Sequence, residues 1–176
     1  SAAHKFHGPK GVGFTYINKS TKIKSFICGG PQERGLRAGT ESVHNIVGMT
    51  KALEIADKNM EQEAKHVLSI KEYMIDNLRK LFPDIHFNGE SGDIKNSTYT
   101  ILNVCLPISN DKAAMLDFNL DLNGIACSRG SACQSGSSKG SHVLDEIQSE
   151  DQKKFPSVRF HFLIIIKLKK LIISLI

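Results

Sequence analysis

The order of apolar segments in the second half of the chain constrains its fold more than any other feature. Residues 98–106, 124–128 and 158–162 have the pattern of short strands. Residues 111–120 and 141–147 lie between them and are expected to be helical. The resulting β-α-β-α-β order predicts a small α/β domain in which helices cover a sheet.

A long helical region precedes this domain. Apolar side chains recur at helical spacing from Val43 to Ile55, and again from Val67 until Pro83 ends the pattern. Thr40 is the expected N-cap of the first run. The polar stretch 57–62 between the two runs is expected to be a bend or a solvated turn.

The N-terminal stretch is expected to be mostly irregular. Residues 1–13 are punctuated by His, Gly and Pro and are expected to form a loop, which a short strand at 13–17 follows. No initiator Met is present, so Ser1 is not expected to be a natural start.

Composition excludes several classes of protein. The 176 residues carry 23 Lys and Arg against 18 Asp and Glu, a formal net charge of +5, and 40% of them are apolar. This composition excludes collagen-like, mucin-like and wholly disordered chains. A nucleic-acid partner ranks last, because three of the five excess charges lie in the tail, at Lys167, Lys169 and Lys170.

The cysteines indicate a reducing, cytoplasmic compartment. The chain has four cysteines, and no two of them form a Cys-x-x-Cys pair, which disfavours a zinc site. They are Cys28, Cys105, Cys127 and Cys133. A disulfide framework is not expected in a chain of this length and pattern. No metal site is therefore predicted.

The last fourteen residues, 163–176, break the pattern of the chain. They hold six Ile, four Leu, three Lys, one Ser and no acid. They are too short and too charged to span a membrane, and no membrane partner is predicted. A core strand or a membrane-surface helix fits poorly. Dropping one base from suitable codons for Ser-Tyr-Asn-Asn-Lys-Val-Lys-Lys-Ile-Asp-Tyr-Phe-Ile-Asp yields this tail, so we hypothesise a frameshift after Phe162.

Four short segments carry the functional signal. They are AHKFHGPKG at 3–11, QERGLRAGTE at 32–41, CSRGSAC at 127–133 and SVRF at 157–160. Any one of them is a weak match, but their order and spacing together resemble the C-terminal half of the cysteine desulfurases. These are pyridoxal-phosphate (PLP) enzymes with the class V aminotransferase fold. The resemblance runs from Ser1 to about Phe162.

The resemblance implies an α/β fold, with the end of a large PLP-binding domain of fold type I followed by a small C-terminal α/β domain. The large domain would end within 1–40, and 41–82 would be a linking helical region. The small domain with the catalytic cysteine loop would span 83–162. Residues 163–176 would be an atypical tail.

Lys5 is the candidate Schiff-base residue. A PLP enzyme needs a lysine amine to hold the aldehyde, and nearby cations keep part of that amine neutral. Such neighbours of Lys5 are His4, His7 and Lys10. On its own, a lysine in a motif of this kind is more often a solvated loop residue. The resemblance implies that Lys5 binds PLP and carries the substrate proton, and that His4 helps to bind the cofactor. Ala2 stands where the family usually has a hydroxyl residue.

Thr40 and Arg159 are the candidate binding residues. A hydroxyl and backbone N–H groups at a helix start can bind phosphate, although plain N-capping is more common. The resemblance implies that Thr40 reaches the cofactor phosphate of the neighbouring subunit, and hence a homodimer with composite sites. A guanidinium can clamp a carboxylate with paired hydrogen bonds. The resemblance gives Arg159 that role, and an edge-strand surface charge is the plain alternative.

Cys133 is the candidate nucleophile. It lies among Ser, Gly and Ala, which indicates an exposed loop, whereas Cys105 lies between apolar neighbours and Cys127 is expected in the core. A neighbouring cation such as Arg129 favours the reactive thiolate. Incidental exposure is the plain alternative. The resemblance implies that Cys133 takes sulfur from L-cysteine as a persulfide, leaves L-alanine, and passes the sulfur to an acceptor protein.

The leading interpretation is therefore a PLP-dependent cysteine desulfurase, present here as a fragment that binds PLP poorly and is inactive alone. The family's pocket also needs a phosphate-binding turn, a ring-stacking histidine and an acid from the half before Lys5. A non-catalytic remnant or dimerisation and docking module stays open, as does a selenocysteine lyase or aminotransferase relative. Iron–sulfur cluster assembly and tRNA thiolation both stay open as destinations of the sulfur.

A DNA read across this locus tests the fragment and the frameshift together. We expect in-frame codons for the missing half of the pocket upstream of Ser1, and one base that restores a polar helix after Phe162. A gene that starts near Ser1 and reads straight through the tail would favour the remnant instead.

Overall fold

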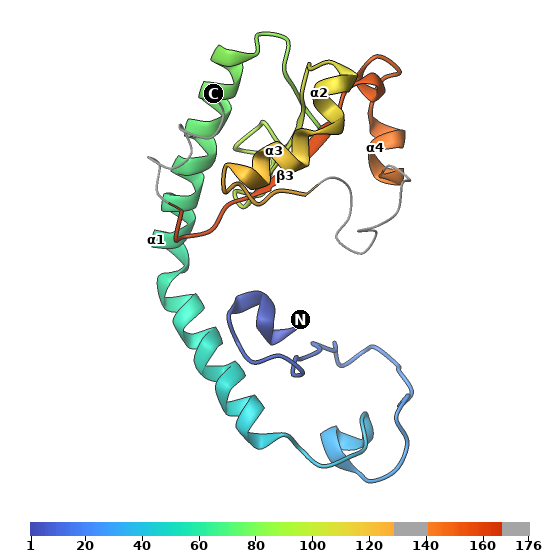
Figure 1. Cartoon of the computed structure of the whole chain (residues 1–176). Helices are drawn as coiled ribbons and strands as arrows, with labels where there is room; N and C mark the ends of the chain where they lie inside the picture. The colour runs from blue at the N-terminus through green and yellow to red at the C-terminus, as the bar shows by residue number, and fades with distance from the viewer. Residues whose placement is uncertain (129–140, 167–176) are drawn as a thin grey trace. The chain divides into compact units, whose positions relative to one another are not determined.

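The computed structural model describes residues 1–128 and 141–166 (Figure 1). The chain divides into two compact units, Ser1–Glu61 and Gln62–Ile176. Cys133 and most of the tail lie outside the described residues. The division of the chain into four parts stays a prediction.

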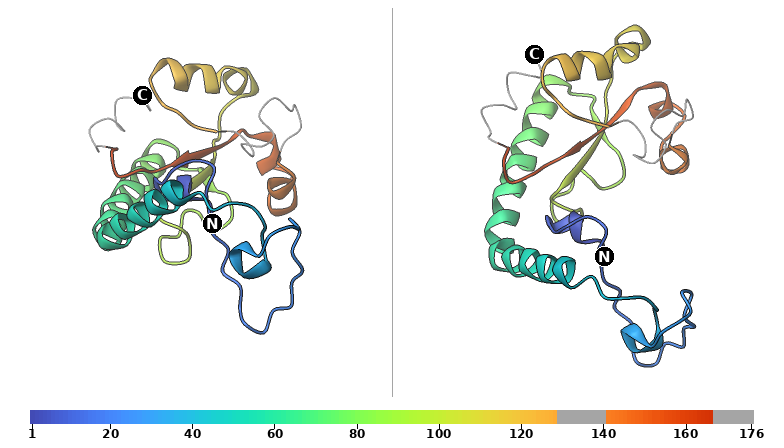
Figure 2. Two further views of the ribbon diagram at one scale, coloured as in Figure 1. Left: turned by 90° about the horizontal axis from the view of Figure 1, so that it is seen from below. Right: turned by 60° about the horizontal axis from the view of Figure 1, so that its bottom comes forward.

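The first unit, all of whose residues are described, is mostly irregular backbone. Its short 3-10 helices are η1 (Ala3–Phe6) and η2 (Gln32–Gly35), and Figure 2 shows the stretch between them as an open loop in blue. Ala3 and Ala38 are the buried apolar side chains of this unit. The expected strand at 13–17 is wrong, because this segment forms a single bridge, from Gly13 to Ala2.

One continuous helix, α1 (Val43–Leu81), takes the place of the two expected runs. The expected bend at 57–62 is wrong: Lys58, Met60, Glu61 and Gln62 are good helix formers and the helix runs through them. Thr40 is not its N-cap, since the helix begins directly after Ser42, whose carbonyl accepts from the N–H of Ile46 at 3.0 Å. None of the helices in the described part of the chain is long and apolar enough to cross a bilayer.

The second unit contains a three-stranded antiparallel sheet in the order β1 (His86–Phe87), β2 (Ile101–Cys105), β3 (Ser157–His161). The strands expected at 98–106 and 158–162 are confirmed as β2 and β3. The strand expected at 124–128 is reduced to one antiparallel bridge between Ser128 and Arg159. The sequence did not reveal β1, because two residues are too few to show an alternating pattern.

The expected helices of this unit are present with adjusted bounds. The helix expected at 111–120 is divided into α2 (Asn110–Ala114) and α3 (Leu116–Leu122). The helix expected at 141–147 is confirmed as α4 (His142–Ile147), whose N-cap Ser141 accepts from the N–H of Leu144 at 3.4 Å. A short 3-10 turn, η4 (Gln152–Lys154), leads into β3. The α/β fold class is confirmed.

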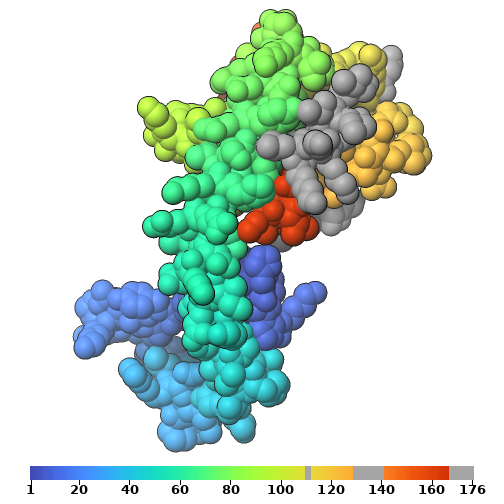
Figure 3. Space-filling view, turned by 90° about the vertical axis from the view of Figure 1, so that its left-hand side faces the viewer, coloured from blue at the N-terminus to red at the C-terminus, as the bar shows by residue number. Residues whose placement is uncertain are grey.

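Strand alternation and helix periodicity together build the core of the second unit. Alternate residues of β2 and β3 point to one face of the sheet, and residues three or four apart on α1 pack against them. The buried members are Val67, Ile70, Met74, Ile75 and Leu78 from α1 with Leu102, Val104, Val158 and Phe160 from the strands. The space-filling view of Figure 3 shows the outer side of α1 open to solvent.

Lys71 is a charged residue within this core. Its side chain is 0% exposed, and its amine donates to Ser97 Oγ at 2.7 Å and to the Thr98 carbonyl at 2.8 Å. Burial lowers the pKa of the amine, and the charge of Asp93 acts in the opposite direction. These contacts fasten the loop before β2 onto α1.

The atypical tail is described as far as Ile166, which packs against the core. The frameshift hypothesis stays a prediction.

Leu78→Ala should destabilise the second unit by about 2–5 kcal/mol, because Leu78 is 0% exposed and its removal leaves a cavity. Leu81→Ala is the matched control, since Leu81 ends the same helix and is 48% exposed, and we expect it to lose about 0.5 kcal/mol. Urea unfolding followed by circular dichroism measures both. Equal losses of unfolding free energy in the two variants would contradict the assignment of Leu78 to the core.

Candidate functional site

Lys5 lies on η1, a turn fixed by the main chain. The N–H of Ala3 donates to the Val12 carbonyl at 3.0 Å, and that of Gly8 donates to the Ala3 carbonyl at 2.9 Å. Ala3 is 0% exposed, and a Cβ added at Gly8 would lie 2.9 Å from the Cβ of Ala3. The backbone under Lys5 is therefore closely packed, so that little room is left for it to shift.

The side chains of this turn face solvent. Lys5 and His4 are both exposed, and within the described residues neither makes a side-chain hydrogen bond or an ion pair. A primary amine in this state is accessible to an aldehyde. The structure thus places Lys5 where an external cofactor could reach it.

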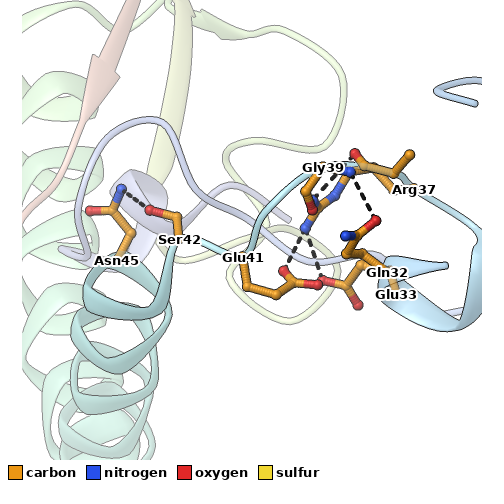
Figure 4. A network of polar contacts seen from close by, with 8 residues as sticks. Gln32, Glu33, Arg37, Gly39, Glu41, Ser42 and Asn45 are labelled. Carbon is orange, nitrogen blue, oxygen red and sulfur yellow. Dashed lines mark hydrogen bonds and ion pairs between the residues drawn. The ribbon is translucent and has the colours of Figure 1, made fainter. Parts of the chain in front are cut away.

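The segment around Thr40 is organised by Arg37 (Figure 4). The Nη2 group of Arg37 contacts Glu41 Oε2 at 2.6 Å and Glu33 Oε1 at 3.2 Å, and Nη1 donates to the Gly39 carbonyl at 2.7 Å. The hydrogen bond to Glu41 is the main cause that raises the pKa of Arg37. Arg37 therefore contacts both sequence neighbours of Thr40, which are Gly39 and Glu41.

Thr40 itself is exposed, and its hydroxyl has no hydrogen bond within the described part of the chain. The hydroxyl is not committed to capping α1, which begins at Val43. The Arg37 guanidinium is already paired with carboxylates, so it is less suited to a phosphate. The Thr40 hydroxyl can therefore donate to a phosphate oxygen.

Arg159 lies on β3 opposite Ser128. Their backbones exchange hydrogen bonds of 2.8 and 3.1 Å, and Arg159 Nη2 donates to Ser128 Oγ at 3.1 Å. Arg159 Nε donates to Nε2 of His161 at 2.9 Å. No described residue accepts a hydrogen bond from Nη1, so its N–H groups can bind a ligand carboxylate.

Cys133 and Arg129 lie in the segment 129–140, outside the described residues. Both flanks of that segment are attached to β3. Ser128, before it, pairs with Arg159, and Gln148, directly after α4, donates from Nε2 to Ser157 Oγ at 3.0 Å. The structure therefore brings the carboxylate-clamp candidate and the flanks of the cysteine segment to one strand.

A buried polar network holds Gln148, the residue after α4, in place. Asn88 is 8% exposed, and its Nδ2 donates to Asn103 Oδ1 and to Ser157 Oγ, each at 3.0 Å. Its Oδ1 accepts from Gln148 Nε2 at 2.7 Å. Every member is thus hydrogen-bonded, as buried polar groups require.

Sequence reasoning missed Ser128, His161 and Gln148 as neighbours of the candidate site. Strand alternation could have indicated His161, because residues two apart on a strand share a face with Arg159. Ser128 and Gln148 carry no comparable signal, since their contacts depend on the path of the chain around 129–140.

The remaining cysteines agree with their expected places. Cys105 is buried, its thiol donates to the Gln152 carbonyl at 3.4 Å, and burial raises its pKa. Cys127 is partly buried against the core. Within residues 1–128 and 141–166, no group of three or more His, Cys, Asp or Glu is placed to hold a metal ion.

Comparison with known proteins decides the family. Residues 1–162 match Aminotransferase class-V. The chain belongs to this family. Two cysteine desulfurases, IscS of Dictyoglomus turgidum and that of Bradyrhizobium diazoefficiens, are each 41% identical to it, over 160 and 162 residues. Each match covers 90% of this chain and 39% of the relative.

Solved structures agree with this class V assignment. A NifS-like protein superposes with a TM-score of 0.76 at 32% identity, and the match covers 97% of this chain and 42% of that protein. The structure of SspA in complex with cysteine has a TM-score of 0.63 at 28% identity. The resemblance to cysteine desulfurases is thereby confirmed, and the chain spans about two fifths of the length of these relatives.

The cysteine desulfurases of this class V family depend on PLP, and two groups of the chain fit that cofactor. The exposed Lys5 amine, on a turn whose backbone is closely packed, can hold the aldehyde. The Thr40 hydroxyl, exposed and without a partner among the described residues, can donate to the phosphate.

Asn88→Ala should destabilise the second unit by about 1–3 kcal/mol, because it leaves Gln148 and Asn103 without their buried partner. Asn123→Ala is the control: Asn123 is exposed and bonds only to a helix carbonyl, so its loss should stay near about 0.5 kcal/mol. Thermal unfolding of the two variants compares them. A neutral Asn88→Ala would show that the network contributes nothing.

Proposed function

We propose that the protein to which this chain belongs is a PLP-dependent cysteine desulfurase. It converts L-cysteine to L-alanine and transfers the sulfur to Cys133. The observation that carries this proposal is the match of 90% of the chain to enzymes of that name at 41% identity. The meeting of Arg159 with the flanks of the Cys133 segment on β3 supports it.

Each candidate residue then has a distinct task. Lys5 holds the cofactor through its amine and moves the proton of the substrate Cα. His4 and Thr40 help to bind the cofactor, Thr40 through the phosphate. Arg159 binds the substrate carboxylate through Nη1, which donates to no residue in the described part of the chain. PLP, when bound, supplies an electron sink for the substrate carbon.

Cys133 acts as the nucleophile toward sulfur. Its thiolate attacks the substrate sulfur, so an S–S bond forms and the C–S bond of the substrate breaks. The electron pair of that bond stays with carbon, which takes up a proton, and L-alanine leaves. The persulfide on Cys133 passes its outer sulfur to an acceptor protein.

We also propose that the protein works as a homodimer in the cytoplasm, with no nucleic-acid or membrane partner. Large apolar side chains of the first unit are exposed: Tyr16 is 84% exposed, Phe26 97% and Val43 65%. A unit with almost no core and so many exposed apolar side chains needs further polypeptide to cover it, which both the rest of the protein and a second subunit supply.

Cys133→Ser in the full-length protein should abolish the persulfide and lower the release of alanine from L-cysteine by at least about 100-fold, as removal of a nucleophile does. Cys28→Ser is the control, since Cys28 is exposed on a loop and has no assigned task. Mass spectrometry of the trapped persulfide and an alanine assay measure both.

Undiminished alanine release by Cys133→Ser would favour the selenocysteine lyase or aminotransferase relative. Absence of alanine release by the parent protein would favour the remnant or docking module.

A further inference from the structure

The outer face of β3 presents a row of polar side chains. Val158 and Phe160 point into the core, so Ser157, Arg159 and His161 point to the opposite face. Successive members of this row lie two residues apart, which brings neighbouring side chains within contact distance. Arg159 is the central member.

The guanidinium of Arg159 is held from two sides. Ser128 Oγ accepts from Nη2 at 3.1 Å, and His161 Nε2 accepts from Nε at 2.9 Å. A guanidinium nitrogen can only donate, so the Nε2 atom of His161 must carry no proton in this arrangement. The imidazole is therefore neutral, with its proton on Nδ1.

We propose that His161 is a positioning residue for Arg159: its neutral imidazole fixes the guanidinium with the Nη1 edge turned to a substrate carboxylate, and protonation of the imidazole releases it. This inference rests on the proposed function only in taking that carboxylate to be the substrate's. The recognised group is an α-carboxylate of a small amino acid.

Protonation acts through two effects in the same direction. The imidazolium has no lone pair for the Nε–H of Arg159, and its positive charge repels the guanidinium. Carboxylate binding should therefore weaken as the pH falls through the pKa of His161. Above that pKa the bond is intact and binding is constant.

The surroundings of His161 are consistent with a neutral ring. His161 is exposed on β3, and the partial desolvation of its ring is the main cause that lowers its pKa below the ordinary value of about 6.5, to which the charge of Arg159 adds. Arg159 is the charged group that acts on His161 among the described residues, and the residue paired with it on β2, Ile101, carries no charge. The transition is thus expected below neutral pH.

The test uses the full ¹⁵N-labelled chain and glycine as the carboxylate probe, because its α-carboxyl group is ionised at both pH 8 and pH 5. Titrations at pH 8 and pH 5 follow the Nε–H resonance of Arg159 and the ring nitrogens of His161. We expect glycine to bind about three- to tenfold more weakly at pH 5 than at pH 8, which corresponds to the loss of one partly exposed hydrogen bond. The Arg159 resonance should shift with the midpoint of His161.

Two variants separate positioning from a structural role. His161→Gln keeps an acceptor that cannot be protonated, so it should bind as the wild type does at pH 8 and show no loss at pH 5. His161→Leu removes the acceptor and should bind about three- to tenfold more weakly at both pH values. His86→Gln, an exposed histidine on β1, is the control and should keep the wild-type profile.

The proposal is overturned if His161→Gln keeps the wild-type pH profile, if His161→Leu binds as the wild type does at pH 8, or if glycine causes no shift at Arg159. None of these readouts needs PLP or turnover. Failure of the proposed function would show instead as a parent protein that releases no alanine, whatever the glycine titrations give.

Discussion

The packing of α1 against one face of the antiparallel sheet is the interaction on which the second unit depends. Ile70 and Leu78 are fully buried there against Leu102 and Val158. Burial of side chains of this size contributes about 1.5–3 kcal/mol each, more than any exposed ion pair in the chain can contribute. Since strand residues alternate, fixing this face also fixes which residues face away from it.

The first unit is stabilised in a different way. Its buried apolar side chains are two alanines, Ala3 and Ala38, so hydrophobic burial contributes little. Main-chain hydrogen bonds close the turn under Lys5, and the Arg37 cluster orders the segment around Thr40. Both cofactor-binding candidates thus lie on backbone held by polar contacts, and these contacts are directional enough to place a single side chain.

The sequence predicted the elements whose own apolar pattern is unbroken. β2, β3 and α4 stand where alternation and helical spacing placed them, and the four motifs predicted the family. It failed where local pattern and context disagree: the polar residues 57–62 remain helical inside α1, and the segment 13–17 finds no partner strand. The contacts of Arg159 could not be predicted, because Ser128 is 31 residues away and its position depends on the folded path.

Register links the core to the candidate site. A shift of β3 by one residue would turn Val158 and Phe160 to the solvent and Arg159 into the core. The free-energy cost of burying an unpaired charge prevents this shift. The same register that buries these apolar residues therefore presents Arg159 beside Ser128 and His161, and Ser157 beside Gln148. The site needs no separate stabilising element at β3, since the free energy that fixes the core also sets the position of Arg159, the proposed carboxylate-binding residue, beside Ser128.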